Sequence, residues 1–278
     1  LGGAMNTAAQ VSLFELHEVT YRYEEIVAID ACSLAIERGS RVALLGANGS
    51  GKSTLLMLLD ALQSPSAGSI RFDGRELSAT ALLDERVNHE FRRRVGFVFQ
   101  NPEVQLFNPT VRDEIAFAPL QLGWPVERIR DEVERMVDRM QLRAVVERPT
   151  FRLSMGEKKR VAIASVLILD PEVILLDEPT AGLDPRSQSG VIDLLEEWQG
   201  SGRTVVLATH DLGVIEEIAD RCLVFQEGRL VADRPPGEIV ADLDLLTRTG
   251  LVHSHRHSHR SGLHHAHPHV HHHEHDGS

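Results

Sequence analysis

Short apolar runs and amphipathic stretches alternate along most of the chain. Residues 41–46, 173–177 and 204–209 are apolar runs bounded by polar or turn residues, which is typical of buried parallel strands. Residues 126–140 and 187–199 instead carry apolar residues at helical spacing with charged residues between them, and predict amphipathic helices. Strands that alternate with helices predict an α/β domain built on a largely parallel sheet.

The early part and the end of the chain depart from this pattern. Residues 13–36 and 69–73 are expected to form antiparallel strands beside the main sheet. From His253 onward the chain is a low-complexity, histidine-rich tract, for which we expect disorder in the absence of a ligand. The predicted organisation is an N-terminal extension over 1–12 with a tag remnant before Met5, one domain over 13–252, and a tail over 253–278.

Composition and charge exclude several classes of protein. Of 278 residues, 41 are acidic and 29 basic, which argues against nucleic acid as the main partner because phosphates are bound by clustered cations. Cys32 and Cys222 fit neither a CxxC nor a zinc spacing, and we expect two small core residues in a reducing cytoplasm. No apolar run approaches the ~20 residues that cross a bilayer, so a soluble, cytosolic protein is expected.

One motif predicts a nucleotide site. The strand at 42–45 runs into an eight-residue segment, 46–53, that fits the phosphate-binding pattern GxxxxGK[ST] in its strand–loop–helix setting. Its glycines let backbone N–H groups surround phosphate oxygens, Lys52 can bind the β- and γ-phosphates of ATP, and Ser53 can offer its hydroxyl to Mg²⁺. A glycine-rich turn without a ligand is the alternative, and the setting disfavours it. The predicted ATP contacts are Gly46, Ala47, Asn48, Gly49, Ser50, Gly51, Lys52, Ser53 and Thr54.

A pair of acids supplies the carboxylate that such a loop needs. Asp177 and Glu178 follow four apolar residues, at the carboxyl end of a predicted strand, where open parallel sheets bind their ligands. We expect Asp177 to hold Mg²⁺ and Glu178 to polarise the attacking water. Capping of a strand before Pro179 would explain either acid alone, but not both together with the phosphate loop.

Residues 153–157, Leu-Ser-Met-Gly-Glu, resemble the signature motif of ATP-binding cassette (ABC) proteins, although Met155 and Glu157 depart from its commonest form, LSGGQ. The resemblance covers nearly all of 13–232. It implies a parallel core sheet with an antiparallel β subdomain and a helical subdomain over about 101–165. The site residues that it implies are Tyr23 for adenine stacking, Gln100 for Mg²⁺ and the transport subunit, Ser154 and Gly156 for the nucleotide, Asp184 between the two ATP sites, and His210 for the γ-phosphate.

The family resemblance also implies partners. In this family the signature of one subunit closes on the ATP of the other, so two copies are expected to meet head to tail. ATP hydrolysis is then coupled to transport by integral-membrane subunits at the cytoplasmic face of the cell membrane. Residues 100–107, 109–111 and 114–117 resemble energy-coupling-factor importers, which take up vitamins, cobalt or nickel, and 153–164 is most similar to the cobalt and nickel branch. Phe107 and Phe117 are candidates for contacts with the membrane partner or for the core.

The tail carries twelve of the fifteen histidines. Neutral imidazole suits Ni²⁺ and Co²⁺ as well as Zn²⁺ and Cu²⁺, and acid should release such metals because protons compete for the same nitrogens. A purification tag is the rival interpretation, but the tract is interrupted by other residues, which favours a native tail. The candidate ligands are His253, His255, His257, His259, His264, His265, His267, His269, His271, His272, His273 and His275.

Three other classes of function fit less well. A metallochaperone GTPase would need an NKxD motif, and no asparagine here is followed by lysine. A cassette ATPase that acts on DNA or ribosomes commonly has two cassettes or a coiled-coil insertion. A metal-storage protein on an inert scaffold would leave Glu178 and His210 unexplained. The sequence therefore predicts a transport ATPase that energises import of nickel or cobalt, with a vitamin as the alternative substrate.

Overall fold

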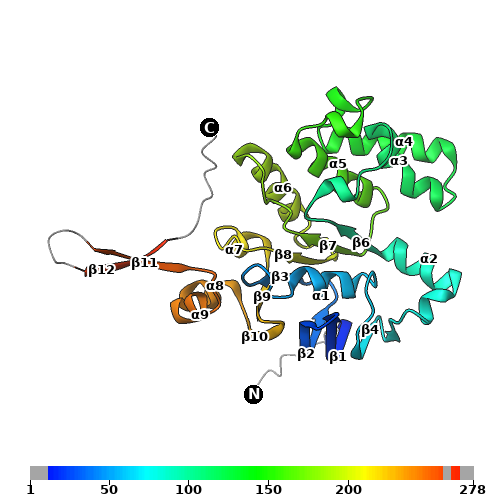
Figure 1. Ribbon diagram of the computed structural model, residues 1–278. Coiled ribbons are helices and arrows are strands. Elements are labelled where there is room, and N and C mark those ends of the chain that lie inside the picture. Colours follow the sequence, from blue (N-terminus) through cyan, green and yellow to red (C-terminus); the bar gives the residue numbers. More distant parts are fainter. Residues whose placement is uncertain (1–11, 259–263, 270–278) are drawn as a thin grey trace, which may run out of the picture.

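The computed structural model describes residues 12–258 and 264–269. Its centre is a six-stranded sheet in the order β10-β9-β3-β8-β7-β6 (Figure 1). All neighbouring strands are parallel except the edge strand β10, which pairs antiparallel with β9. Strands β3, β7 and β8 are buried at every position, which explains their continuous apolar sequences. The strands are β3 (Arg41–Leu45), β6 (Val95–Val98), β7 (Val173–Asp177), β8 (Thr204–Ala208), β9 (Arg221–Gln226) and β10 (Arg229–Arg234).

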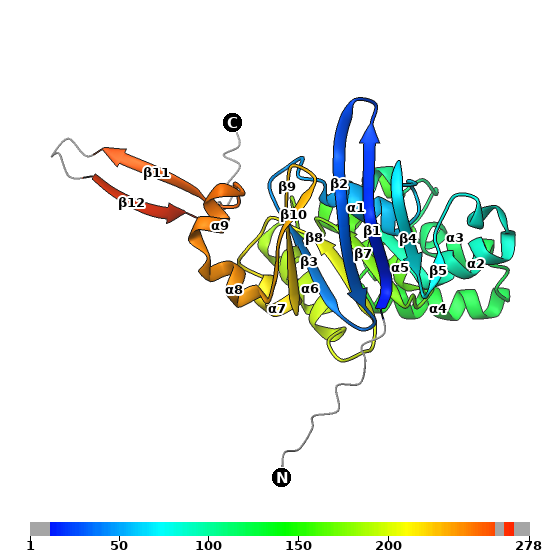
Figure 2. The same cartoon turned by 90° about the horizontal axis from the view of Figure 1, so that it is seen from below.

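A second sheet is antiparallel, as expected. It consists of β2 (Ile26–Glu37), β1 (Ser12–Tyr23), β4 (Ala67–Phe72) and β5 (Arg75–Glu76) in that spatial order. Helix α1 (Lys52–Leu59) lies between the two sheets, because its leucines share one hydrophobic cluster with β1 and β2 on one side and with β3 on the other (Figure 2). The helix that follows the phosphate loop is therefore held by apolar contacts from both sheets.

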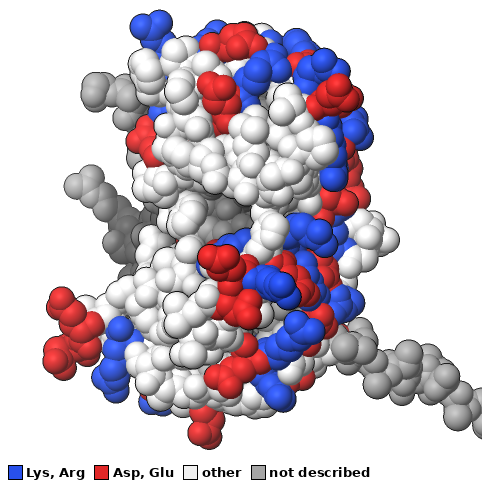
Figure 3. Space-filling view, turned by 90° about the vertical axis from the view of Figure 1, so that its right-hand side faces the viewer, with Lys and Arg blue, Asp and Glu red and all other residues white. Residues whose placement is uncertain are grey.

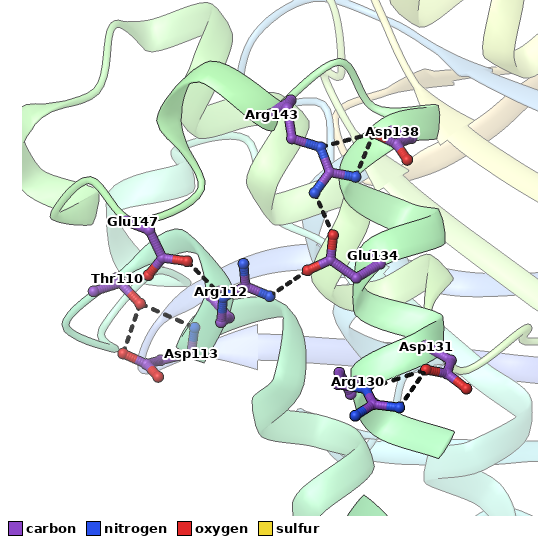
Figure 4. Close-up of polar contacts among 9 residues, drawn as sticks. All are labelled: Thr110, Arg112, Asp113, Arg130, Asp131, Glu134, Asp138, Arg143 and Glu147. Carbon is purple, nitrogen blue, oxygen red and sulfur yellow. Dashed lines mark hydrogen bonds and ion pairs between the residues drawn. The ribbon is translucent and has the colours of Figure 1, made fainter. Parts of the chain in front are cut away.

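Three helices, α3 (Val111–Gln121), α4 (Val126–Arg139) and α5 (Met155–Leu167), gather at one end of the molecule (Figure 1). The apolar face of α4 is buried in the same cluster as residues of α3 and α5. Ion pairs link these segments on the surface: Arg112 donates to Glu134 at 2.6 Å and to Glu147 at 2.7 Å, and Arg143 bonds both Glu134 and Asp138 (Figure 4). These helices lie in and just beyond the stretch expected to form a helical subdomain.

Among the remaining helices of the described residues, α6 (Pro185–Glu197) is the longest. Helix α6 begins two residues earlier than predicted, because Asp184 caps it and Pro185 occupies its first turn. Within the described part of the chain, no helix is both long and apolar enough to traverse a bilayer. The other helices are η1 (Ala81–Leu83), α2 (Glu85–Arg94), η2 (Pro102–Val104), η3 (Arg143–Val145), η4 (Thr150–Arg152), α6 (Pro185–Glu197), α7 (Ile215–Ile218), α8 (Pro236–Ala241) and α9 (Leu243–Arg248).

The surface carries charges of both signs, and the two cysteines are buried. Lys and Arg are interspersed with Asp and Glu on the face shown in Figure 3. Cys32 and Cys222 are buried free thiols, as expected, and burial raises the pKa of Cys32 to about 11 and that of Cys222 to about 12. Both thiols are therefore protonated packing residues at neutral pH.

Two strands of the histidine-rich tail lie within the described residues, and disorder of the tail without a ligand stays a prediction. Strands β11 (His253–Ser258) and β12 (His264–His269) pair antiparallel and extend away from the domain in Figures 1 and 2. Alternating sequence such as His-Ser-His-Arg-His has the two-residue period of a strand, and this favours pairing over an irregular chain. The remaining candidate ligands, His259, His271, His272, His273 and His275, lie outside the described residues.

Candidate nucleotide site

The phosphate loop connects the buried strand β3 to helix α1. Gly46 and Gly51 have φ angles of 149° and 108°, in the region that favours glycine. A Cβ on Gly46 would lie 2.4 Å from the Phe225 carbonyl oxygen, and one on Gly51 would lie 2.5 Å from the Ala28 carbonyl oxygen. Only glycine fits at these two positions, so the neighbouring strands fix the shape of the loop. The hydroxyl of Ser50 is buried in the loop without a hydrogen-bond partner among the described residues.

Lys52 folds back over this loop. Its Nζ donates to the carbonyl oxygens of Gly46 at 2.7 Å and Ala47 at 3.2 Å, and the residue is 6% exposed. Burial lowers the pKa of Lys52, while the charges of Glu178 and Asp177 act in the opposite direction. The ammonium is therefore a buried positive charge held only by carbonyl dipoles and two acids. Phosphate oxygens would be stronger partners for it.

Ser53 and Asp177 come together from the start of α1 and the end of β7. Ser53 Oγ donates to Asp177 Oδ1 at 3.0 Å. Asp177 is 6% exposed, and burial raises its pKa. A hydroxyl beside a carboxylate suits Mg²⁺, which keeps several waters and takes the rest of its oxygen ligands from nucleotide phosphates. Among the described residues, no group of three or more His, Cys, Asp or Glu is arranged to hold a metal ion, at this edge of the sheet or elsewhere.

Glu178 and His210 form the second polar pair at this edge of the sheet. Glu178 Oε1 lies 2.9 Å from His210 Nδ1, and this contact is the main cause of the raised pKa of His210. Glu178 is 4% exposed, and its other oxygen, Oε2, is buried with no partner among the described residues. Buried carboxylate oxygens are rarely left unpaired, so this atom is suited to bind a water molecule. The arrangement fits a carboxylate that polarises a water at a phosphate.

Tyr23 and Gln100 come from different sheets, Tyr23 from the end of β1 and Gln100 from the segment after β6. Tyr23 ends β1 and is 40% exposed, with its ring edge-on to Tyr21 at 4.8 Å between centroids. Its hairpin touches the loop through Ala28, which approaches Gly51. Gln100 is an exposed residue after β6, and its carbonyl accepts a hydrogen bond at 2.6 Å from Lys159.

The signature residues lie at the start of α5. Ser154 caps this helix: its Oγ accepts from the Glu157 N–H at 3.3 Å, and Glu157 Oε2 accepts from the Ser154 N–H at 2.7 Å. Asp184 caps α6 and accepts from the Ser187 hydroxyl at 2.6 Å. A Cβ on Gly156 would lie 2.7 Å from that hydroxyl, so Gly156 and Asp184 are near neighbours in one chain. Their hydrogen bonds stay within the two helix starts, and Ser154 is exposed.

Sequence reasoning missed one residue of this region. Lys159 is completely buried, and its Nζ donates to carbonyl oxygens of the Gln100 segment and of Glu178. A signal was available, because Lys159 stands four residues before the core residue Ile163 and therefore shares its helix face.

Comparisons with known proteins agree with this geometry. A family model described as "ABC transporter" matches residues 29–181. The chain belongs to this family. Over 242 residues it is 52% identical to the nickel import ATP-binding protein NikO of Rhodobacter capsulatus. The aligned part covers 86% of this chain and 95% of that protein. The expected family and its fold, an ABC cassette with parallel and antiparallel sheets, are thereby confirmed.

Two solved structures are similar to this member of the ABC family. One is cbiO1 from Clostridium perfringens, part of the ABC transporter complex cbiONQ, with 35% identity and a TM-score of 0.72 over 86% of this chain and 95% of that one. The other is the dimeric post-hydrolysis state of the ATP-binding cassette MJ0796 bound to ADP and Pi. It is 28% identical, with a TM-score of 0.72 over 80% of this chain and 98% of that one. The nickel import relative agrees with the cobalt and nickel branch expected from 153–164.

Proposed function

We propose that this chain is the ATP-hydrolysing subunit of a membrane complex that imports nickel or cobalt. The observation that carries the proposal is the buried group at the carboxyl ends of β3 and β7. There Lys52 faces the phosphate loop, Ser53 pairs with Asp177, and Glu178 holds an unpartnered oxygen beside His210.

These residues divide the chemistry of phosphoryl transfer among them. The loop N–H groups and Lys52 bind the phosphates of ATP. Ser53 and Asp177 would hold Mg²⁺, which would supply positive charge to the phosphates. Glu178 accepts a hydrogen bond from the attacking water and so orients it toward the γ-phosphorus. His210, fixed by Glu178, has a second ring nitrogen available for a γ-phosphate oxygen. Burial of the acids keeps bulk water away from the reacting group.

A second copy of the chain would complete the site. Ser154 is exposed and its hydrogen bonds stay within α5, so the start of this helix is free to meet a phosphate from outside. The dimeric MJ0796 cassette supports the pairing of two copies that the family resemblance implies. ATP held between two subunits would close the dimer, and hydrolysis would remove the bridging γ-phosphate and let the subunits separate.

The membrane subunits would bind beside Gln100, which makes this a peripheral protein of the cytoplasmic membrane face. A groove of about 280 Å³ lies there, lined by Glu103, Leu106, Thr150, Phe151 and Lys158. Phe151 is 74% exposed, and Phe107, next to Leu106, is 66% exposed. Exposed aromatic rings at a polar-rimmed groove are typical anchors for a partner helix. Phe117 is half-buried against Phe107, so it supports that ring.

Nickel and cobalt are the substrates that the relatives favour. The similar proteins include a nickel import protein and a component of the cbiONQ transporter, and the histidines of the tail are suitable ligands for these metals. In the β11–β12 register, the Cα partners are His253 with His269, His255 with His267, and His257 with His265. We propose that the histidines of this tail bind the transported metal near the complex.

Size-exclusion chromatography of Glu178→Gln with MgATP tests the ATPase proposal. Loss of the carboxylate should stop hydrolysis but leave ATP binding intact, so the variant should elute as a stable dimer. Glu76→Gln, an exposed change on β5, is the matched control and should behave as the wild type. A Glu178→Gln chain that stays monomeric at saturating MgATP would contradict the proposal.

Calorimetry tests the tail. The truncation should follow Val252, because Val252 is 5% exposed and belongs to the domain core. Removal of 253–278 should abolish most Ni²⁺ binding and leave ATP hydrolysis unchanged, and binding should also weaken below about pH 6 as the histidines become protonated. Undiminished Ni²⁺ binding by the truncated chain would refute the metal role of the tail.

A further inference from the structure

Lys159 is an ammonium enclosed by the domain. It lies in the second turn of α5 with no exposed surface. Its Nζ donates to the carbonyl oxygens of Gln100 at 2.6 Å, Phe99 at 3.2 Å and Glu178 at 3.4 Å. Burial lowers its pKa to about 8, and the charges of Asp177 and Glu178 act in the opposite direction. An apolar residue could fill this space without the desolvation penalty of a buried charge. The three hydrogen bonds are therefore what distinguishes Lys159 from an apolar core residue.

The contact with the Glu178 carbonyl oxygen, at 3.4 Å, helps to hold the backbone of Glu178. This residue has a φ angle of 45°, which is unusual for a residue other than glycine and persists only where the surroundings enforce it. The Glu178 N–H donates to the Ala208 carbonyl at 3.0 Å, and the Glu178 carbonyl accepts from the Ala181 N–H at 3.2 Å as well as from Lys159. Lys159 therefore contributes to the backbone conformation that aims the Glu178 carboxylate.

The other two contacts attach the Gln100 segment to α5. Gln105 adds to this attachment: its Oε1 accepts from the Phe99 N–H at 3.2 Å, and its Nε2 donates to the Ala162 carbonyl of α5 at 2.9 Å. Residues 99–105 and the signature helix are thus joined by side chains from both directions. A displacement of α5 would be transmitted to Gln100 and, through Lys159, to Glu178.

We propose that Lys159 is a positioning residue that couples the two ATP sites of the dimer. The start of α5 would contact the ATP held by the partner subunit, whereas Glu178 and Gln100 act on the ATP held by their own subunit. Lys159 joins these two groups of residues. Closure of the signature on one ATP thereby adjusts the catalytic carboxylate of the other site. This inference rests on the proposed function and adds a link within each chain.

The first test compares homodimers of the full chain in complex with its membrane subunits. Lys159→Met keeps the alkyl chain but removes the three donors. Its affinity for ATP should stay within two-fold of wild type, because the phosphate loop is untouched, while kcat should fall about ten-fold. The control is Arg130→Met, which removes an exposed cation from α4 and should leave both values unchanged.

The decisive test uses a dimer with one live site. A Lys52→Ala chain paired with a wild-type chain keeps one phosphate loop, and the Lys52→Ala chain supplies only the signature to it. Lys159→Met is then placed in the wild-type chain, whose own signature faces the phosphate loop of the Lys52→Ala chain and therefore closes on no ATP. Since no closure is passed to Glu178 in this dimer, coupling through Lys159 predicts that Lys159→Met lowers hydrolysis at the live site at least three-fold less than it does in the homodimer.

The outcomes separate the two proposals. An equal loss of hydrolysis in the one-site dimer and in the homodimer would overturn the coupling role and leave the ATPase proposal standing. Absence of hydrolysis in the wild-type complex would instead overturn the ATPase proposal. Thermal unfolding of each variant checks folding, and Lys159→Gln, which retains an N–H donor, replaces Lys159→Met if the latter does not fold. Lys159→Gln should lose less activity than a variant without any donor.

Discussion

The phosphate-loop half and the signature half of the site differ in how they are held. In the first, Lys52, Asp177 and Glu178 are each at most 6% exposed and bond to groups from other strands and loops of the same chain. In the second, Ser154 is exposed and bonds only within its own helix. The fold therefore completes the half that binds the phosphates, whereas it leaves the signature facing outward for a partner.

Lys52→Ala should break the first half and give the largest effect. Loss of a charge-assisted hydrogen bond costs about 1.5–3 kcal/mol, so the affinity of the monomer for ATP should fall roughly 10–100-fold and hydrolysis should become undetectable. Titration with a fluorescent ATP analogue at low protein concentration measures this affinity. Arg135→Ala, an exposed change on α4, serves as the control. Wild-type affinity in the Lys52→Ala chain would mean that the loop does not hold the phosphates.

Gly156→Ala should damage only the second half. The new Cβ would lie 2.7 Å from the Ser187 hydroxyl, which Asp184 holds by a short hydrogen bond, so the starts of α5 and α6 must shift. We expect steady-state hydrolysis to fall about ten-fold while ATP affinity of the monomer stays unchanged. Gly190→Ala is the matched control, because a Cβ there meets no atom within 4 Å. Equal loss in both variants would indicate a general effect of alanine instead.

His210 should give the smallest effect, on stability of the nucleotide-free chain. Its pKa is raised in the folded state, chiefly by Glu178, so the pair stabilises the fold fully below the unfolded pKa of about 6.5. This stabilisation is lost as pH rises through the folded-state pKa. Because the His210 side chain is 50% exposed, the contribution should be at most about 1 kcal/mol.

Urea unfolding at pH 5.5 and 8.5 measures the contribution of this pair. His210→Ala should be less stable than wild type at the lower pH, and the difference should shrink at the higher pH. A difference that grows with pH would show that the sign of this linkage is wrong.

Local pattern predicted most of the fold. The short apolar run of β7, bounded by polar residues, is typical of a buried strand. The apolar residues of α4 recur at helical spacing, which is typical of an amphipathic helix. The start of α6 was less predictable, because the apolar spacing begins at Val191 and does not reveal the cap at Asp184. The hairpin of the tail was not expected, since composition gives no information about strand pairing.

The sequence alone determined the phosphate loop and its chemistry, because residues 46–53 are contiguous and a loop of that pattern can adopt few other conformations. Tertiary structure decided the contacts between distant segments: the pairing of Glu178 with His210, the approach of Gly156 to Ser187, and the enclosure of Lys159 by three carbonyls. The physical reason is that hydrogen bonds between distant segments depend on how sheets and helices pack, and no local pattern records that packing.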